Sequence, residues 1–212
     1  MEQQKFLRLA VAAGTLALVA GCASTPASTT RYVAQLQPMN TAVAGGPTTG
    51  QASFTERAGE LVIDVQVKGA PAGIEHWQHF HGFKNGQPAT CPTAASDANH
   101  DGIVDLIETG PAAGTTMVPF IAHPASMDIP HGSYPVADAS GAYHYHVAVP
   151  VSELQAAFAK QFPGQKLDLD KRVVFIHGVP AATRLPASVQ SLGPIPAQVT
   201  LPIACGVIRK AG

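Results

Sequence analysis

The sequence predicts an all-β fold, an antiparallel barrel or sandwich with one inserted helix. Short apolar runs recur along the chain, and the connections between them are rich in the 20 glycines and 18 prolines. One stretch, residues 153–161, instead has the apolar spacing of an amphipathic helix. Short, regularly spaced strands with long connections are typical of antiparallel barrels and sandwiches.

The N-terminus has the features of an export signal. A short charged start precedes the apolar stretch 9–20, which is too short to span a bilayer as a mature helix. It ends in Leu18–Cys22, which resembles the lipobox of bacterial lipoproteins, where the cysteine is acylated and becomes the new N-terminus. We therefore predict a signal peptide, residues 1–22, and a lipid anchor on Cys22 that holds the protein to a bilayer of the bacterial cell envelope. An ordinary cleaved signal and a buried helix ending in cysteine are the alternatives.

The rest of the chain is predicted to form a linker and one domain. Residues 23–50 are rich in Ser, Thr, Ala, Pro and Gly, which indicates a flexible linker that can contribute one strand, Tyr32–Gln37. Residues 51–210 are long enough for one domain with its own core. The formal net charge of −1 and the lack of a basic cluster argue against nucleic acid as a partner.

The first strands of the domain are predicted by alternation. Gln51–Arg57 and Glu60–Val67 form an expected hairpin, because apolar and polar residues alternate along the second run. Ile74–Phe83 is the third expected strand and carries the first histidines. The stretch Cys91–Pro135 is long and irregular, and we expect a functional loop with short pieces of structure.

The second half of the domain is predicted to contain the helix and the remaining strands. Ser152 is placed to cap the helix Glu153–Gln161. The expected strands are Tyr143–Val149, Lys171–His177 and Gln198–Ile208.

Residues 97–108 match the twelve-residue calcium loop of an EF-hand. Gly102 at the sixth position permits the sharp turn, and the flanking segments do not form helices, so the loop is set into another fold. We expect a structural calcium clamp rather than a sensor, the alternative being an ordinary surface turn. The predicted ligands are Asp97, Asn99, Asp101, Ile103 through its carbonyl, Asp105 and Glu108.

The cysteines predict a disulfide. With Cys22 assigned to the lipobox, Cys91 and Cys205 remain as a pair in an oxidising compartment. A site in which two thiolates bind a metal is the alternative.

The nine histidines indicate a metal site. His79 and His81 lie two residues apart on an expected strand, so both point to one face, and His177 lies in another apolar strand. Neutral imidazole is a good ligand for copper and zinc. Of the others, His76 is expected to be hydrogen-bonded or at the rim and His100 to face solvent, while a second metal site and a plain sheet surface remain open for His144 and His146.

Four stretches resemble the copper/zinc superoxide dismutases and the similar chordin-type domains, in the family's order. They are Gly73–Gly82 with His79-Phe-His81, His123 with His131-Gly132, Arg172–His177, and Ala204–Ile208. The resemblance implies a Greek-key barrel with a long metal-binding loop. It also implies copper ligands at His79, His81, His123 and His177, a zinc ligand at His131, and a disulfide from Cys205 back to Cys91.

The chain also departs from that family. The family's active-site arginine, which guides and holds the anion, lies three residues before the C-terminal cysteine, and Pro202 stands there. The remaining zinc ligands have only candidate counterparts in Asp128, Asp138 and His144. The expected function is that of an exported, lipid-anchored copper-binding protein, with superoxide dismutation as the activity that the resemblance implies. A non-catalytic envelope module stabilised by calcium is the alternative.

Overall fold

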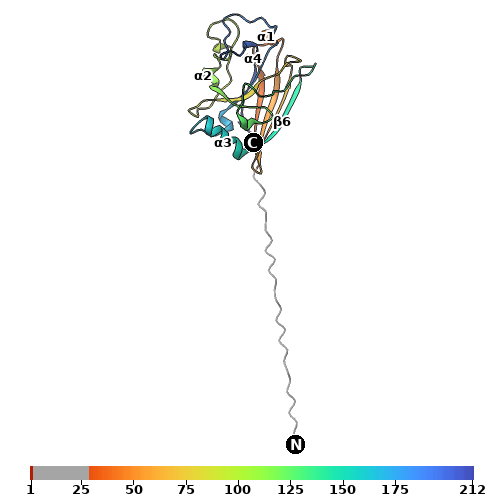
Figure 1. Cartoon of the computed structure of the whole chain (residues 1–212), viewed down its shortest axis with the longest axis vertical. Coiled ribbons are helices and arrows are strands. Elements are labelled where there is room, and N and C mark those ends of the chain that lie inside the picture. Colours follow the sequence, from red (N-terminus) through yellow and green to blue (C-terminus); the bar gives the residue numbers. More distant parts are fainter. Residues whose placement is uncertain (2–28) are drawn as a thin grey trace.

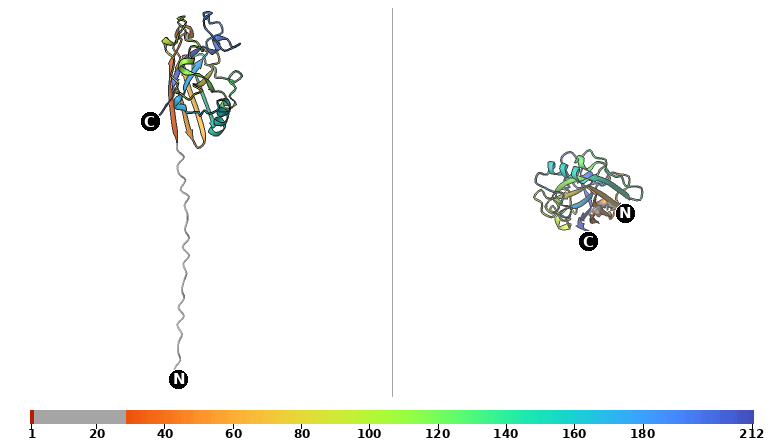
Figure 2. Two further views of the ribbon diagram at one scale, coloured as in Figure 1. Left: turned by 90° about the vertical axis from the view of Figure 1, so that its left-hand side faces the viewer. Right: turned by 90° about the horizontal axis from the view of Figure 1, so that it is seen from below.

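The computed structural model describes Met1 and residues 29–212. The predicted signal peptide, Cys22 and the first part of the predicted linker lie outside this part of the chain. The described residues form an all-β fold, as predicted, in which nine antiparallel strands build one sheet that curls into a half-barrel (Figures 1 and 2).

The strands follow one another along most of the described chain. They are β1 (Thr30–Pro38), β2 (Thr49–Arg57), β3 (Glu60–Lys68), β4 (Gln78–Gly82), β5 (Thr115–Pro119), β6 (Tyr143–Pro150), β7 (Val173–His177), β8 (Pro202–Val207) and β9 (Arg209–Lys210). The helices are α1 (Thr41–Ala44), α2 (Gly110–Ala113), α3 (Val151–Gln161) and α4 (Ala197–Thr200), with 3-10 turns η1 (Ala94–Ser96), η2 (Pro124–Ser126) and η3 (Leu169–Lys171). No helix of this described part is long and apolar enough to cross a membrane.

The order of strands in the sheet is β5-β4-β7-β8-β1-β2-β3-β6, and β9 pairs with β1. Crossovers therefore connect β3 to β4 and β6 to β7, and they bring β4 and β7 side by side although about half the domain separates them in sequence. In Figure 1, α1 and α4 lie at one end of the sheet and α3 lies near the other. The crossovers bring together the strands that carry the predicted metal ligands.

The predicted hairpin is confirmed as β2 and β3. Arg57 pairs with Glu60, and Ala58 and Gly59 between them have φ angles of 50° and 83°. Two positive φ angles define the tight hairpin turn whose twist matches that of the strands. The alternation of β3 buries Leu61, Ile63, Val65 and Val67 on the inner face.

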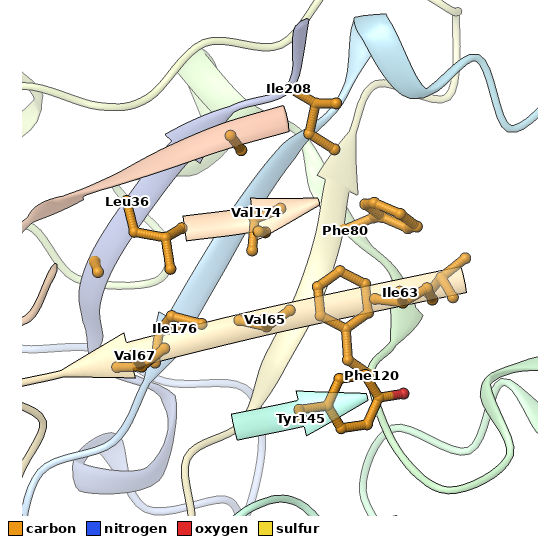
Figure 3. Close-up of a cluster of buried hydrophobic side chains, with 14 of the residues drawn as sticks. Leu36, Ile63, Val65, Val67, Phe80, Phe120, Tyr145, Val174, Ile176 and Ile208 are labelled. Carbon is orange, nitrogen blue, oxygen red and sulfur yellow. The ribbon is translucent and has the colours of Figure 1, made fainter. Parts of the chain in front are cut away.

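The main hydrophobic core fills the concave face of the sheet (Figure 3). Phe80 belongs to this core, and its ring centroid lies 4.9 Å from that of Phe54 and 4.8 Å from that of Phe120. Val174 and Ile176 of β7 face the same core. Because side chains alternate along a strand, the neighbours of Phe80 and Ile176 point to the outer face.

Several element boundaries differ from the predictions. The linker strand expected at Tyr32–Gln37 is confirmed as the slightly longer β1, which lies between β8 and β2 within the sheet and buries Ala34 and Leu36. The strand β5 lies inside the stretch expected to be irregular. Pro150 rather than Ser152 precedes the first turn of α3, without a side-chain cap. The first residues of the last predicted strand, Gln198–Ile208, belong to the helix α4, and the strand β8 begins only at Pro202.

The disulfide between Cys91 and Cys205 is present and joins Cα atoms 5.8 Å apart. It links the segment after β4 to β8, where Cys205 pairs with Phe175 of β7. Cys205 and Phe175 belong to a second, smaller core on the outer face of the sheet, together with Ala89, Ala113 and Val173. The bridge therefore fastens a long loop over this outer face.

Candidate metal centre

Three of the predicted ligands meet on the outer face of β4 and β7. His79 and His81 lie on β4, and His177 ends β7, where its N–H donates a hydrogen bond to the Trp77 carbonyl. The antiparallel register places His79 opposite Phe175 and His81 opposite Val173. Alternation on both strands therefore turns the three imidazoles away from the main core and toward each other.

The three imidazoles are close enough to share one ion. One nitrogen from each ring lies within 4.8 Å of the corresponding nitrogens of the other two. The ring centroid of His177 lies 5.2 Å from that of His79 and 5.7 Å from that of His81. All three side chains are buried, with exposed fractions of 1–3% for His79, His81 and His177.

Each imidazole has one nitrogen with a polar neighbour and one without. The Nδ1 atom of His177 donates to the Thr200 carbonyl at 2.7 Å, Nε2 of His79 lies 3.2 Å from the Tyr134 hydroxyl, and Nε2 of His81 lies 3.2 Å from Thr116 Oγ1. The other nitrogens of the three rings are buried and have no hydrogen-bond partner. A buried polar atom without a partner is costly, and a metal ion satisfies it.

The hydrogen bonds orient the free nitrogens as ligands. The Tyr134 hydroxyl donates its one proton to the Ile129 carbonyl at 2.9 Å, so its oxygen accepts from His79 Nε2–H. The Thr200 carbonyl can only accept, so His177 carries its proton on Nδ1. Both assignments leave a lone pair on the unpartnered nitrogen, which is the form of imidazole that binds a metal.

Burial keeps the triad neutral. The pKa of His177 is lowered to about 4 by desolvation, against a smaller opposite effect of its hydrogen bond to Thr200. Desolvation, followed by repulsion between the rings, holds the pKa values of His79 and His81 well below the usual range. The three rings are therefore neutral imidazoles at neutral pH, and no proton has to leave the binding nitrogen before a metal binds.

An apolar cavity of about 290 Å³ opens onto the triad. His79 and His177 form part of its wall, and the loop 179–196 covers it with Leu192 and Ile195. Its remaining lining within the described chain contains no lysine or arginine; it consists of Trp77, Leu106, Thr115, Thr116, Ile129, Pro130 and Thr200. The approach to the triad is therefore apolar and uncharged.

The backbone beside His177 requires glycine at position 178 and pairs His177 with Pro202. Gly178 turns the chain away with a φ of 113°, and a Cβ at this position would lie 3.1 Å from the Glu75 carbonyl oxygen. Pro202 is buried opposite His177 in the pairing of β7 with β8. The position at which the resembled family has its arginine thus faces the end of the ligand strand but carries no charge.

The structure does not bring His123 and His131 to the triad. His123 is exposed directly before η2, and His131 is exposed and hydrogen-bonds Asp128 at 2.9 Å through Nδ1. Neither belongs to a group of metal-ligating side chains in the described chain. The chain between β5 and β6 instead places Tyr134 beside His79, so the expected fourth copper ligand and the zinc ligand are not assembled here.

The other zinc candidates have separate environments. Asp138 accepts hydrogen bonds from Ser140 and Ala142 within its own turn. His144 contacts Asp64 on the outer face of the sheet, on the far side of the strand order from β4. The described residues therefore do not gather a zinc site beside the triad.

His76 is hydrogen-bonded, which is one of the two expected environments. Its ring is buried, with Nδ1 3.0 Å from the His177 carbonyl and Nε2 2.9 Å from the Pro71 carbonyl. His76 thus ties the segment before β4 to the end of β7 and supports the backbone of His177. His100 is exposed with a φ of 60°.

The calcium-type loop folds back on its own carboxylates. Asp97 accepts from the Gly102 N–H at 2.8 Å, and Glu108 accepts from the N–H groups of Ala98 and Asp105. Gly102 has a φ of 84°, as its place in the turn requires. The predicted ligands thus share one turn, but their acidic oxygens do not converge within 4.8 Å as the triad nitrogens do.

No protein-family model matches this chain, and no curated protein sequence matches it. The resemblance to the superoxide dismutases is therefore a matter of the sequence motifs alone. The described residues define an all-β protein with a buried three-histidine site that can hold a metal ion.

Sequence reasoning missed the polar groups that hold the triad. Thr116 lies on the unexpected strand β5, Tyr134 lies in the long irregular stretch, and Thr200 ends the helix α4 where a strand was expected. Their roles depend on how long loops return to the sheet, which strand alternation does not determine. The neighbouring prolines and glycines gave no signal for these three contacts.

Proposed function

We propose that this protein is an exported, lipid-anchored copper-binding protein whose metal is held by His79, His81 and His177. The observation that carries the proposal is the set of three buried imidazole nitrogens without hydrogen-bond partners, on rings that each bring one nitrogen within 4.8 Å of the others. Three neutral imidazoles without a thiolate or carboxylate suit copper or zinc, and copper(II) binds such ligands more tightly than the other divalent ions of the first row.

The protein residues around the site would hold and orient the ligands. Thr200 and Tyr134 fix the rings of His177 and His79, and Thr116 lies against His81. The apolar roof of Leu192 and Ile195 would exclude bulk water. Bound copper would supply one-electron chemistry between two oxidation states, and the cavity lined by His79 and His177 would give a small molecule access to the site.

The site supports metal binding more strongly than it supports superoxide dismutation. Superoxide is an anion, and the uncharged cavity and Pro202 offer it no electrostatic guidance. The resemblance to dismutases nevertheless gives this activity as the second candidate, because the His-x-His strand and His177 match that family's copper strands.

Metal analysis and activity assays separate the two candidates. The purified protein is expected to contain or take up one copper per chain, to lose it in the His177→Ala variant and to retain it in His123→Ala, which serves as the matched control. Superoxide removal by the copper-loaded protein is expected to be slow. Rapid removal would establish dismutation instead, and a chain that takes up no copper would contradict both candidates.

Export and lipid anchoring are part of the same proposal. The disulfide between Cys91 and Cys205 supports an oxidising compartment, and the lipobox-like Leu18–Cys22 supplies the anchor. Mass spectrometry of the mature N-terminus is expected to find a diacyl or triacyl group on Cys22. An unmodified N-terminus elsewhere in the chain would contradict the anchor.

We further propose that calcium binds the loop 97–108 and stiffens the roof of the cavity. Four carboxylates lie in this loop, and none of the ion pairs in the described chain involves them. Asp101 accepts from Ser188 Oγ and Asp105 from the Gln190 N–H, both at 2.6 Å, so the loop is already tied to the segment that covers the triad. A cation would offset the repulsion between the carboxylates.

Melting the protein with and without a calcium chelator tests this second site. We expect a higher midpoint with calcium in the natural protein and no calcium effect in Asp97→Asn/Glu108→Gln. The control is Asp138→Asn, an exposed turn carboxylate outside the loop. An unchanged melting point in the natural protein would rule out a calcium clamp.

A further inference from the structure

A second group of potential metal ligands lies on the outer face of β3 and β6, away from the triad. The carboxylate oxygen Asp64 Oδ2 is 2.7 Å from His144 Nε2 and 2.9 Å from His146 Nδ1. One ligand atom from each of the three residues lies within 4.8 Å of the others. The proposed copper site uses none of these side chains.

The sheet register brings these three residues together. Asp64 pairs directly with His146 across the ladder, and Gln66 pairs with His144. Residues two apart on each strand point to one face, so the two imidazoles and the carboxylate project from the same outer surface. The inward neighbours Val65 and Tyr145 are buried, which fixes the face on which the three side chains stand.

The spacing of the ligand atoms fits a coordinated ion. Histidine nitrogens and carboxylate oxygens bind zinc at about 2.0–2.2 Å, so neighbouring ligand atoms in a tetrahedral shell are about 3.4 Å apart. The two contacts of Asp64, at 2.7 and 2.9 Å, are somewhat shorter than that separation. The ion could therefore be accommodated by small side-chain rotations without moving the strands.

The group is reachable from solvent. The side chains of His144 and His146 are 55% and 58% exposed and that of Asp64 is 26% exposed. β6 is the last strand of the sheet order, so nothing in the described sheet covers its outer edge. Three protein ligands on an open surface leave further coordination positions for water or for a side chain of another molecule.

The carboxylate is poised as an anion in this setting. Partial burial on its own would raise the pKa of Asp64, but hydrogen bonds with His144, His146 and Gln66 outweigh burial and lower that pKa. Gln66 Nε2 donates to the other oxygen, Oδ1, at 3.3 Å. One oxygen is thus held by an amide, while the other faces both imidazoles.

We propose that Asp64, His144 and His146 form a surface site for a divalent transition ion of the zinc class, with open coordination positions toward solvent. Two imidazoles and one carboxylate are the ligand types that such ions take in proteins. The site is separate from the buried triad and stands whether or not the triad binds copper, because it uses different strands and a different part of the sheet.

Site-resolved titration with zinc tests the proposal on the full folded chain. The imidazole NMR signals of His144 and His146 are expected to shift together and to saturate at one equivalent, while those of the exposed His100 and His131 stay in place. Signals of the buried triad are read separately, so the outcome at each site is independent of the other. Signals of His144 and His146 that remain unmoved at millimolar zinc would overturn the proposal.

Exposed variants supply the controls. Asp64→Asn keeps the shape and is expected to weaken zinc binding by about 10-fold or more, because outer partners alone change metal affinity by about 10-fold to 100-fold. His131→Gln, which removes another exposed histidine next to a carboxylate, is expected to leave the affinity unchanged. Equal zinc affinity in the natural chain and in Asp64→Asn would mean that the three side chains only hydrogen-bond one another. That result would overturn the proposal of a metal site.

Discussion

At the scale of single residues, the triad depends on the group behind each imidazole. Tyr134, Thr116 and Thr200 each contact one ring nitrogen and leave the other nitrogen of that ring without a hydrogen-bond partner. Such contacts fix both the tautomer and the ring orientation, and they reduce the conformational freedom lost when a metal binds. The chain therefore presents ligands that are oriented before any metal arrives.

Removing the hydroxyl of Tyr134 tests this orientation. Tyr134→Phe is expected to lower copper affinity by about 10-fold, because His79 Nε2 then loses its acceptor and the ring can adopt the other tautomer. The matched control is Tyr145→Phe, whose hydroxyl also donates to a buried carbonyl, that of Ile121, but lies outside the triad. Competition titration with a copper chelator measures both, and equal affinities would contradict the role of Tyr134.

Acid is expected to destabilise the metal-free protein. The pKa of a histidine in the unfolded chain is about 6.5, whereas burial lowers the pKa of His177 in the fold to about 4. Between these two pH values the unfolded chain binds more protons than the folded chain. The contribution of His177 to the free energy of unfolding is therefore fully present above about pH 6.5 and is lost as the pH drops toward 4. His177 alone contributes about 3 kcal/mol to this loss, and His79 and His81 act in the same direction.

Urea unfolding in the presence of a metal chelator measures this dependence. The free energy of unfolding is expected to decrease from pH 7 to pH 4.5, and the decrease is expected to be smaller in His177→Gln. A natural chain that is equally stable at both pH values would contradict neutral burial of the triad.

At the scale of elements, the strand β7 is held at its start by a buried arginine. Arg172 is 1% exposed, and its guanidinium donates to the carbonyls of Leu167 and Lys166 at 2.9 and 2.7 Å. It also lies 5.6 Å from the ring centre of Phe158, on the inner side of α3. A single side chain thus joins β7, the segment before it and the helix.

Truncating this side chain is expected to destabilise the fold. Arg172→Met would leave buried carbonyls without donors and is expected to lower the free energy of unfolding by about 2–4 kcal/mol. Arg57→Met, at an exposed position of the first hairpin, is the control and is expected to change stability by less than about 0.5 kcal/mol. Chemical denaturation measures the free energy of unfolding of both variants. Similar small effects in the two variants would contradict this role of Arg172.

Sequence patterns predicted the elements with clear periodicity and missed those without it. The hairpin, the His-x-His strand and the strand ending in His177 follow from alternation and from apolar runs. The strand that the linker can contribute, Tyr32–Gln37, is confirmed as β1, although polar residues mask most of the alternation that buries Ala34 and Leu36. β5 was missed because it is short, ends in Pro119 and lies in a segment rich in alanine and glycine.

The part of the metal site that lies on strands with clear periodicity was predicted, and the part on loops was not. His79 and His81 share a strand face, and His177 lies in a buried run, so their convergence required only that β4 and β7 be neighbours. The placement of His123 depended on the path of a long loop, which carries no periodic signal. The roles of Thr116, Tyr134 and Thr200 likewise arise only when distant segments pack together.

At the scale of the whole molecule, long loops cover the outer face that bears the triad. The disulfide between Cys91 and Cys205 closes a loop of 114 residues and fixes one side of this cover. Asn40 fixes another part, because its side chain exchanges hydrogen bonds with the backbone of Val104 and also donates to the Pro202 carbonyl. The buried site therefore depends on cross-links between segments far apart in the sequence.

Reducing the disulfide is expected to destabilise the protein. Opening a loop of this length costs up to about 4–5 kcal/mol in the chain-entropy model, and the cover over the triad would loosen with it. Thermal melting with and without a reductant measures the change, and the Cys91→Ser/Cys205→Ser variant is the control that should not respond to reductant. A melting point that reductant leaves unchanged in the natural chain would contradict this role.

Electron paramagnetic resonance of the protein loaded with one equivalent of copper(II) tests the metal centre most directly. We expect one copper per chain with hyperfine coupling to three imidazole nitrogens, a loss of that pattern in His177→Ala and an unchanged pattern in His123→Ala. A spectrum without imidazole coupling, or one that His177→Ala leaves unaltered, would show that the three buried histidines do not hold the metal.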